Sequence, residues 1–111
     1  MNRKGGGAGA GKIVVLYLKE PREKLWGILL ETGMAGIWFR GLELNSFEDY
    51  AHQEAGKKEP LVQPNTLFVP YLRVEKIVED EDSGSLPSLS TRFRQVTGLK
   101  AGPHLTKGRR Q

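Results

Sequence analysis

The sequence predicts a mainly β protein: a small, strongly bent barrel of five strands, Sm-like or otherwise SH3-like, with one inserted helix and a short C-terminal helix. Three observations predict it. Residues 12–44 read as three consecutive strands separated by turns, residues 45–55 form an acidic, helix-like stretch, and residues 66–79 read as two further strands. A length of 111 residues allows one domain.

The first three strands are separated by short stretches of turn-forming residues. Residues 13–19 are mostly β-branched and apolar, which is typical of a strand with both faces buried. Residues 20–23 predict a turn with Pro21 at its second position. Residues 24–32 form the second strand, and the glycine-rich stretch 33–36 predicts a hairpin into a third strand at 37–44.

Gly27 and Gly41 lie inside the second and third predicted strands. Glycine within a strand usually marks a bend, a bulge or a close approach of two backbones. Two such glycines in neighbouring strands favour a sheet that curls upon itself over a flat one. Pro70 donates no backbone hydrogen bond, so we expect it at a strand end, edge or corner. We interpret these three residues as structural.

The stretch between the third and fourth strands predicts the inserted helix at about residues 46–55. Ser46 is suited to cap it, and Asp49 stands three residues further on, as in a capping box. Phe47, Tyr50 and Ala51 supply its apolar stripe.

An exposed loop at 57–65 follows, and the last two strands are expected at 66–69 and 72–79, broken at Pro70. Residues 87–97 predict the C-terminal helix, which Gly98 would end.

Composition divides the chain into three parts. Residues 1–11 are rich in glycine and predict a flexible arm, residues 12–97 form the folded domain, and residues 98–111 predict a basic, disordered tail. The arm matches the spacing of a phosphate-binding loop, but Ile13 stands where that loop needs Ser or Thr, and no strand precedes it. We therefore interpret this match as chance.

The net charge of +4 comes from the two ends of the chain. Residues 13–91 hold all 13 acidic residues but a minority of the 17 lysines and arginines. A basic chain often binds nucleic acid, but here the predicted folded body is acidic, so the charge says little about its surface.

The sequence indicates no catalytic or metal-binding motif. It contains no cysteine, which excludes disulfides and thiolate metal sites and fits a reducing compartment. His52 with Glu48 and Asp49 can share one helix face, but this arrangement is more typical of solvated side chains. We expect a non-enzymatic, cytoplasmic protein without a cofactor, metal or small-molecule substrate, and the longest apolar run, residues 13–18, is too short to span a membrane.

The candidate binding residues are aromatic and basic: Trp38, Arg40, Tyr71 and Arg73. Trp38 and Arg40 alternate along the third strand, so their side chains point the same way, and Tyr71 and Arg73 have the same spacing. Such side chains can form a protein-binding hot spot or stack single-stranded bases. In the alternative interpretation, Trp38 covers a small core and Arg40 extends towards a neighbouring carboxylate.

Residues 24–29 with the following hairpin, and residues 68–77, resemble the strands and tight turn of the Sm-like fold. The resemblance implies a bent barrel that assembles into rings through its edge strands, and many members bind uridine-rich RNA. The Asp and Asn of the family's RNA-binding turn are replaced here by Gly33 and Ile37. The resemblance therefore does not imply a uridine-binding pocket in this chain. Residues 20–27, 40–41 and 46–49 also resemble a group of small uncharacterised bacterial proteins, which implies no activity.

From these observations we expect a binding or assembly module that acts through the edge strands of its barrel, in self-association or with a protein partner. The alternative is RNA binding, in which the basic ends contribute phosphate affinity and the aromatic and arginine side chains stack on bases.

Overall fold

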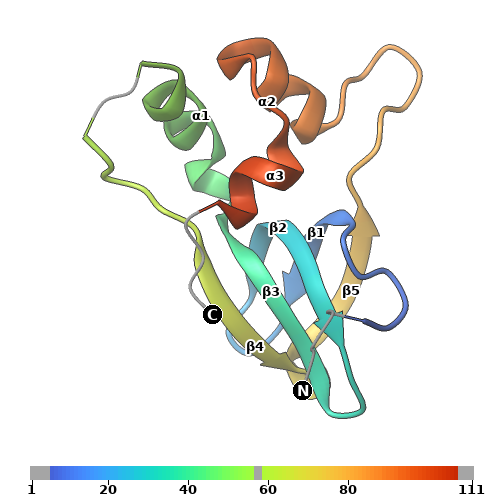
Figure 1. Cartoon of the computed structure of the whole chain (residues 1–111). Coiled ribbons are helices and arrows are strands. Elements are labelled where there is room, and N and C mark those ends of the chain that lie inside the picture. The colour runs from blue at the N-terminus through green and yellow to red at the C-terminus, as the bar shows by residue number, and fades with distance from the viewer. Residues whose placement is uncertain (1–5, 57–58, 108–111) are drawn as a thin grey trace.

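The computed structural model describes residues 6–56 and 59–107. One antiparallel sheet of five strands, in the order β4-β3-β2-β1-β5, carries three helices at one end (Figure 1). The elements are β1 (Ile13–Leu18), β2 (Glu23–Thr32), β3 (Gly36–Glu43), α1 (Phe47–Gly56), β4 (Asn65–Pro70), β5 (Val74–Glu79), α2 (Leu89–Thr97) and α3 (Ala101–Thr106).

The prediction of a mainly β fold with five strands, an inserted helix and a short C-terminal helix is confirmed. The sheet is not a closed barrel, because β4 and β5 form its two edges and do not pair with each other. A single 3₁₀ turn, Tyr71–Arg73, joins these two edges directly after Pro70. Pro70 therefore lies at a strand end, as expected.

The two strand glycines are neighbours across the sheet. Gly27 on β2 is the register partner of Gly41 on β3. A Cβ atom on Gly27 would lie 2.2 Å from the Arg40 carbonyl oxygen and 2.8 Å from the Phe39 ring. Of the three alternatives for these glycines, a bend, a bulge or a close backbone approach, the structure shows the close approach. The space that a side chain would need is filled by the opposite strand and by the Phe39 ring.

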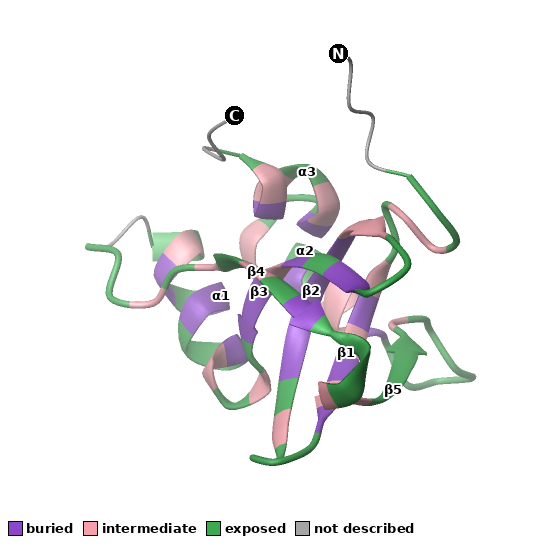
Figure 2. Ribbon diagram, turned by 90° about the horizontal axis from the view of Figure 1, so that it is seen from below, coloured by how far each residue is buried: buried purple, intermediate pink, exposed green. Residues whose placement is uncertain are grey.

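Two hydrophobic layers hold the sheet, one on each face. The first is formed by side chains of the strands themselves: Val14, Leu16, Leu18, Leu25, Leu29, Ile37, Phe39 and Val69. The second lies between the sheet and the helices and includes Trp26, Ile28, Leu42, Phe47, Tyr50, Ala51, Phe93, Ala101 and Leu105. Figure 2 shows the buried residues running along β2 and on the inner sides of α1 and α3, whereas β5 is exposed. Because both faces of the sheet are covered at its centre, β1 carries no charged residue and the middle of β2, residues 25–30, is apolar as well.

The helices that cover the sheet begin and end at residues suited to these positions. α1 follows directly on a 3₁₀ turn, Leu44–Ser46, and buries Phe47, Tyr50 and Ala51. α2 begins at Ser88, whose hydroxyl accepts a hydrogen bond from the Thr91 amide, and it ends at Gly98 in the left-handed conformation (φ 78). Both the apolar stripe of α1 and the glycine end of α2 agree with the sequence prediction.

The expectation of a disordered tail from residue 98 is wrong as far as Lys107. Residues Ala101–Thr106 form α3, and its Ala101 and Leu105 are buried in the layer between sheet and helices. These two residues are four positions apart, so they lie on one face of the helix. The burial of these two side chains stabilises the helix, although the composition of the segment, with its glycine and polar residues, indicated disorder. Residues 108–111 of the predicted tail lie outside the described residues.

The expected flexible arm is likewise wrong for residues 6–11. The Gly11 amide donates to the Leu29 carbonyl (2.7 Å), and the Thr32 amide donates to the Gly6 carbonyl (2.8 Å). Gly7, Gly9 and Gly11 have positive φ, so the glycines let the segment coil against the end of β2. Residues 1–5 lie outside the described residues. Within the described residues, every helix is too short or too polar to cross a membrane.

Candidate functional site

Trp38 lies within β3 and is partly exposed. Its side chain is 41 % exposed and lies against Phe68, its register partner on β4, with ring centroids 5.3 Å apart. Phe68 is similarly exposed. The two rings form an aromatic pair beside the open edge of the sheet.

Tyr71 lies at the turn that follows β4. Its hydroxyl donates to the Gly33 carbonyl (2.7 Å) and its amide donates to the Ala35 carbonyl (3.1 Å), so it fastens the β2–β3 hairpin. Met34, at the tip of that hairpin, and Leu72, beside Tyr71, are almost fully exposed.

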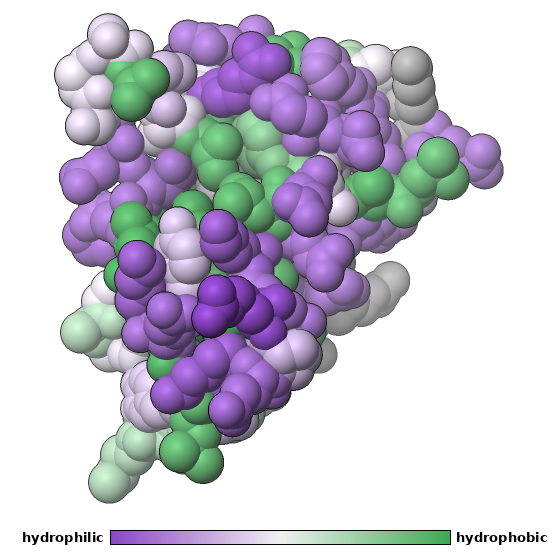
Figure 3. Space-filling view, turned by 180° about the vertical axis from the view of Figure 1, so that it is seen from behind, coloured by the Kyte–Doolittle hydropathy of each residue, from purple (hydrophilic) through white to green (hydrophobic). Residues whose placement is uncertain are grey.

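We define the apolar rim as the exposed side chains around this hairpin and the β4 edge: Met34, Trp38, Phe68, Tyr71 and Leu72. Figure 3 views the molecule from behind and shows a few hydrophobic residues at the lower tip, among hydrophilic and neutral ones. Exposed apolar side chains that gather in one region of a surface are typical of an interaction site.

Arg73 has a different environment. It donates to the Pro21 carbonyl (3.1 Å) and to the Glu23 carboxylate (3.2 Å), and so connects the turn after β4 to the β1–β2 turn. Its buried Nε has no hydrogen-bond partner among the described residues. These contacts are intramolecular and give Arg73 a role in holding the sheet ends together.

Arg40 points towards the helices. Its Nε donates to the Leu105 carbonyl in the last turn of α3 (2.6 Å), and its Nη1 donates to the Thr66 hydroxyl (3.0 Å). A cation at a helix C-terminus is favourable because the free carbonyls there carry partial negative charge. The four predicted residues therefore do not converge: Trp38 belongs to the apolar rim, and Arg40 belongs to a pocket on the helical side.

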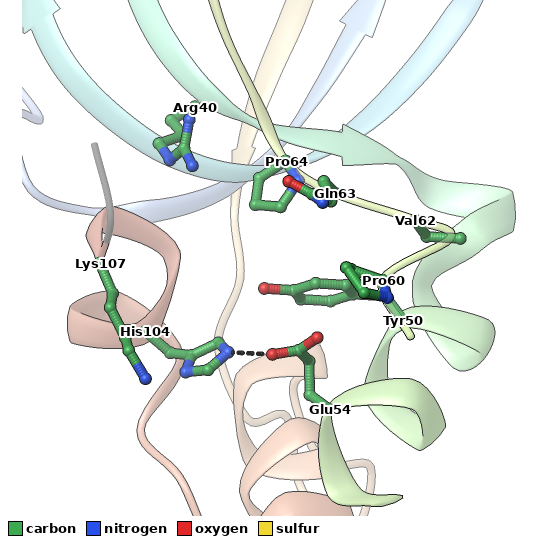
Figure 4. Close-up of a pocket in the computed structure, with 9 residues that line it drawn as sticks. All are labelled: Arg40, Tyr50, Glu54, Pro60, Val62, Gln63, Pro64, His104 and Lys107. Carbon is green, nitrogen blue, oxygen red and sulfur yellow. Dashed lines mark hydrogen bonds and ion pairs between the residues drawn. The ribbon is translucent and has the colours of Figure 1, made fainter. Parts of the chain in front are cut away.

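That pocket, which we call the basic pocket, is a cavity of about 280 Å³ between α1, α3, β3 and the segment that leads into β4. Figure 4 shows its lining residues: Arg40, Tyr50, Glu54, Pro60, Val62, Gln63, Pro64, His104 and Lys107. Arg40, Lys107 and His104 supply basic groups, and Glu54 is the acidic one in this set. The pocket therefore differs in charge from the acidic body of the chain.

A contact at hydrogen-bond distance between His104 and Glu54 forms the floor of the basic pocket. His104 Nε2 lies 2.8 Å from Glu54 Oε1, and both side chains are largely buried. Burial raises the pKa of Glu54, but hydrogen bonds from Gln53 and His104 outweigh it and leave the pKa below its usual value.

Tyr50 forms the wall of the pocket beside this pair. Its residue is only 3 % exposed, and burial, reinforced by the Glu54 charge, raises the pKa of Tyr50 to about 12. The hydroxyl is therefore protonated at neutral pH and able to donate a hydrogen bond.

Sequence reasoning missed the contributions of Tyr50, Glu54 and His104. Tyr50 was assigned only to the core stripe of its helix, and His104 fell in the segment expected to be disordered. The apolar spacing of Ala101 and Leu105 was the available signal, since it indicates a helix that would bring His104 back onto the domain.

The predicted acidic–histidine face on α1 is solvated. Glu48 accepts two hydrogen bonds from Arg92 (3.0 and 3.1 Å) and lies 3.6 Å from His52. The hydrogen bond from Arg92 is the main reason why the pKa of Glu48 is lowered. Over residues 6–56 and 59–107, no group of three His, Asp or Glu side chains is arranged to hold a metal ion.

Comparison of the chain with protein-family models, with curated proteins and with solved structures finds no match.

Proposed function

We propose that the protein is a non-catalytic, cytoplasmic assembly module in which the open β4 edge of one copy pairs with a strand of a second copy. Among the described strands, β4 pairs with β3 alone and β5 pairs with β1 alone. An edge strand presents unpaired backbone N–H and C=O groups, which can receive another strand. The absence of cysteine in the sequence fits a reducing compartment.

The composition of β4 is the observation that carries the proposal. Its six residues, Asn65–Pro70, contain no charged side chain. Natural proteins usually protect an exposed edge with charges, especially lysine, and β5 follows this rule with Glu75, Lys76 and Glu79. β4 lacks this protection, and the apolar rim lies directly beside it. Burial of Trp38 and Phe68 against a second copy would remove apolar surface from water.

Sedimentation of the full chain over a range of concentrations tests this proposal. We expect a mass that rises with concentration. Phe68→Lys places a charge at the edge and should weaken association at least about tenfold, the effect of losing a central contact residue. Leu86→Lys is the matched control, because Leu86 is also strongly exposed but lies in the loop before α2. A strict monomer at all concentrations, or equal weakening by both variants, would contradict self-association.

A protein partner other than a second copy and single-stranded RNA are the competing candidates. RNA binding is the less favoured of the two, because Arg40 and Arg73 already donate hydrogen bonds within the chain. Titration of labelled single-stranded RNA at low salt provides a direct check. Saturable, salt-sensitive binding by a monomeric chain would replace the assembly proposal.

A further inference from the structure

We propose that the basic pocket binds a small oxyanion, the phosphate or carboxylate group of a small molecule, through Arg40, Tyr50 and Lys107. This site is separate from the β4 edge and does not depend on self-association. Three observations carry the proposal: a tyrosine hydroxyl that opens onto the cavity, an excess of positive charge, and an apolar wall.

The first observation is the Tyr50 hydroxyl. The Tyr50 residue is almost completely buried, but its hydroxyl is not among the buried unpartnered atoms of the described residues, because it opens onto the cavity. Figure 4 shows this hydroxyl pointing into the space between Arg40 on one side and the His104–Glu54 pair on the other. A hydroxyl that opens onto a cavity can donate a hydrogen bond to a group that enters the cavity from outside the chain. A protonated phenol favours an acceptor there.

The second observation is the charge of the lining. Arg40 uses its Nε and Nη1 to hold Leu105 and Thr66, which fixes the guanidinium plane and leaves its other N–H groups available. Glu54, the acidic residue of the lining, is already occupied by His104. With Lys107 at its rim the pocket therefore keeps positive charge, and Arg40 supplies donors fixed in place, which is the arrangement that recognises phosphate and carboxylate groups.

The third observation is the shape of the opposite wall. Pro60, Val62 and Pro64 come from the segment that leads into β4 and present apolar surface to the cavity. The volume of about 280 Å³ lies just below the usual size of small-molecule sites, roughly 300–1,000 Å³. A ligand of this size places its charged group against Arg40 and Tyr50 and its carbon atoms against the prolines.

Direct titration calorimetry on the full chain at constant ionic strength tests the proposal. Inorganic phosphate and acetate are the two probes, and chloride at equal ionic strength is the reference. We expect saturable binding of at least one probe. Tighter binding of phosphate would assign a phosphate-bearing ligand, and equal or tighter binding of acetate would assign a carboxylate.

Tyr50→Phe separates binding from folding, because the ring stays stacked on Phe93 (centroids 5.8 Å apart) and only the hydroxyl is lost. It should weaken binding on the order of ten- to a hundredfold, as expected for one hydrogen bond to a charged group. Lys107→Met should weaken binding as well, whereas Lys100→Met, outside the lining, should not. Absence of saturation with both probes, or unchanged affinity in both Tyr50→Phe and Lys107→Met, would overturn the proposal.

Discussion

Gly27 on β2 and Gly41 on β3 face each other so closely that a methyl group on either would lie 2.6 to 2.8 Å from the α-carbon of the other. The Phe39 ring lies over the same pair, 2.8 Å from both positions that a methyl group would occupy. The two strands β2 and β3 can therefore come this close only if both residues lack a side chain. The pair acts as one structural unit, although its members are distant in the sequence.

We predict that Gly27→Ala and Gly41→Ala each lower the free energy of unfolding by about 2 to 3 kcal/mol or more, because the methyl group overlaps backbone atoms that cannot move aside. Urea unfolding of the full chain measures this. Gly102→Ala is the matched control, since no atom lies within 4 Å of its Cβ position in α3. Alanine should stabilise that helix by up to about 1 kcal/mol. Equal effects at all three positions would contradict the close approach.

Asp80 connects the sheet to α2. Its carboxylate accepts hydrogen bonds from the buried Trp26 indole (3.1 Å) and from the amides of Leu89 (2.9 Å) and Ser90 (2.8 Å). Asp80→Ala should lower stability by about 2 to 4 kcal/mol, because a helix cap is lost and a buried donor is left unpaired. The exposed neighbour Glu81 provides the control, and Glu81→Ala should change stability by less than about 0.5 kcal/mol. A small effect of Asp80→Ala in thermal unfolding would show that water replaces the carboxylate.

Stability should fall at acidic pH. The pKa values of Glu48, Glu54 and Asp82 are all lowered in the folded chain, mainly by hydrogen bonds to the charged carboxylates. A lowered pKa means that the unfolded chain binds protons first, so this stabilisation is complete above the unfolded value of 4.5 for Glu and 3.8 for Asp. It is lost as the pH falls through the lower folded values.

Urea midpoints measured from about pH 6 down to about pH 2.5 test this pH dependence. Glu54→Gln should flatten the curve, because the amide cannot be protonated in this range. Identical slopes for the natural chain and the Gln variant would show that the Glu54–His104 pair contributes no stability.

The two tryptophans should report separate regions. Trp26 is fully buried between sheet and helices, and Trp38 is partly exposed in the apolar rim. Trp38→Phe should leave a blue-shifted emission that iodide quenches only weakly. Trp26→Phe should leave the red-shifted, strongly quenched component. If Trp38 is already protected from iodide in the natural chain at high concentration and not at low concentration, the apolar rim is covered by self-association.

The strands and the first two helices were predictable because their signals are local. Alternation and turn residues located β1 to β3 to within a residue or two, and Gly98 marked the end of α2. The glycine-rich arm and α3 were not predictable in this way. Residues 6–11 become ordered only because the end of β2 offers hydrogen-bond partners, and α3 is ordered because Leu105 fills a space that the sheet and the other helices create.

The sequence by itself determined the mainly β architecture and the need for two glycines within the strands, since both follow from periodicity and backbone sterics over short distances. Only the tertiary structure decided that the sheet stays open, that Trp38 and Arg40 serve different surfaces, and that Tyr50 meets His104 in a basic pocket. These outcomes depend on contacts between residues as many as 65 positions apart, such as Arg40 with the Leu105 carbonyl. A local pattern carries no information about such contacts, because their energy depends on which surfaces the folded chain brings together.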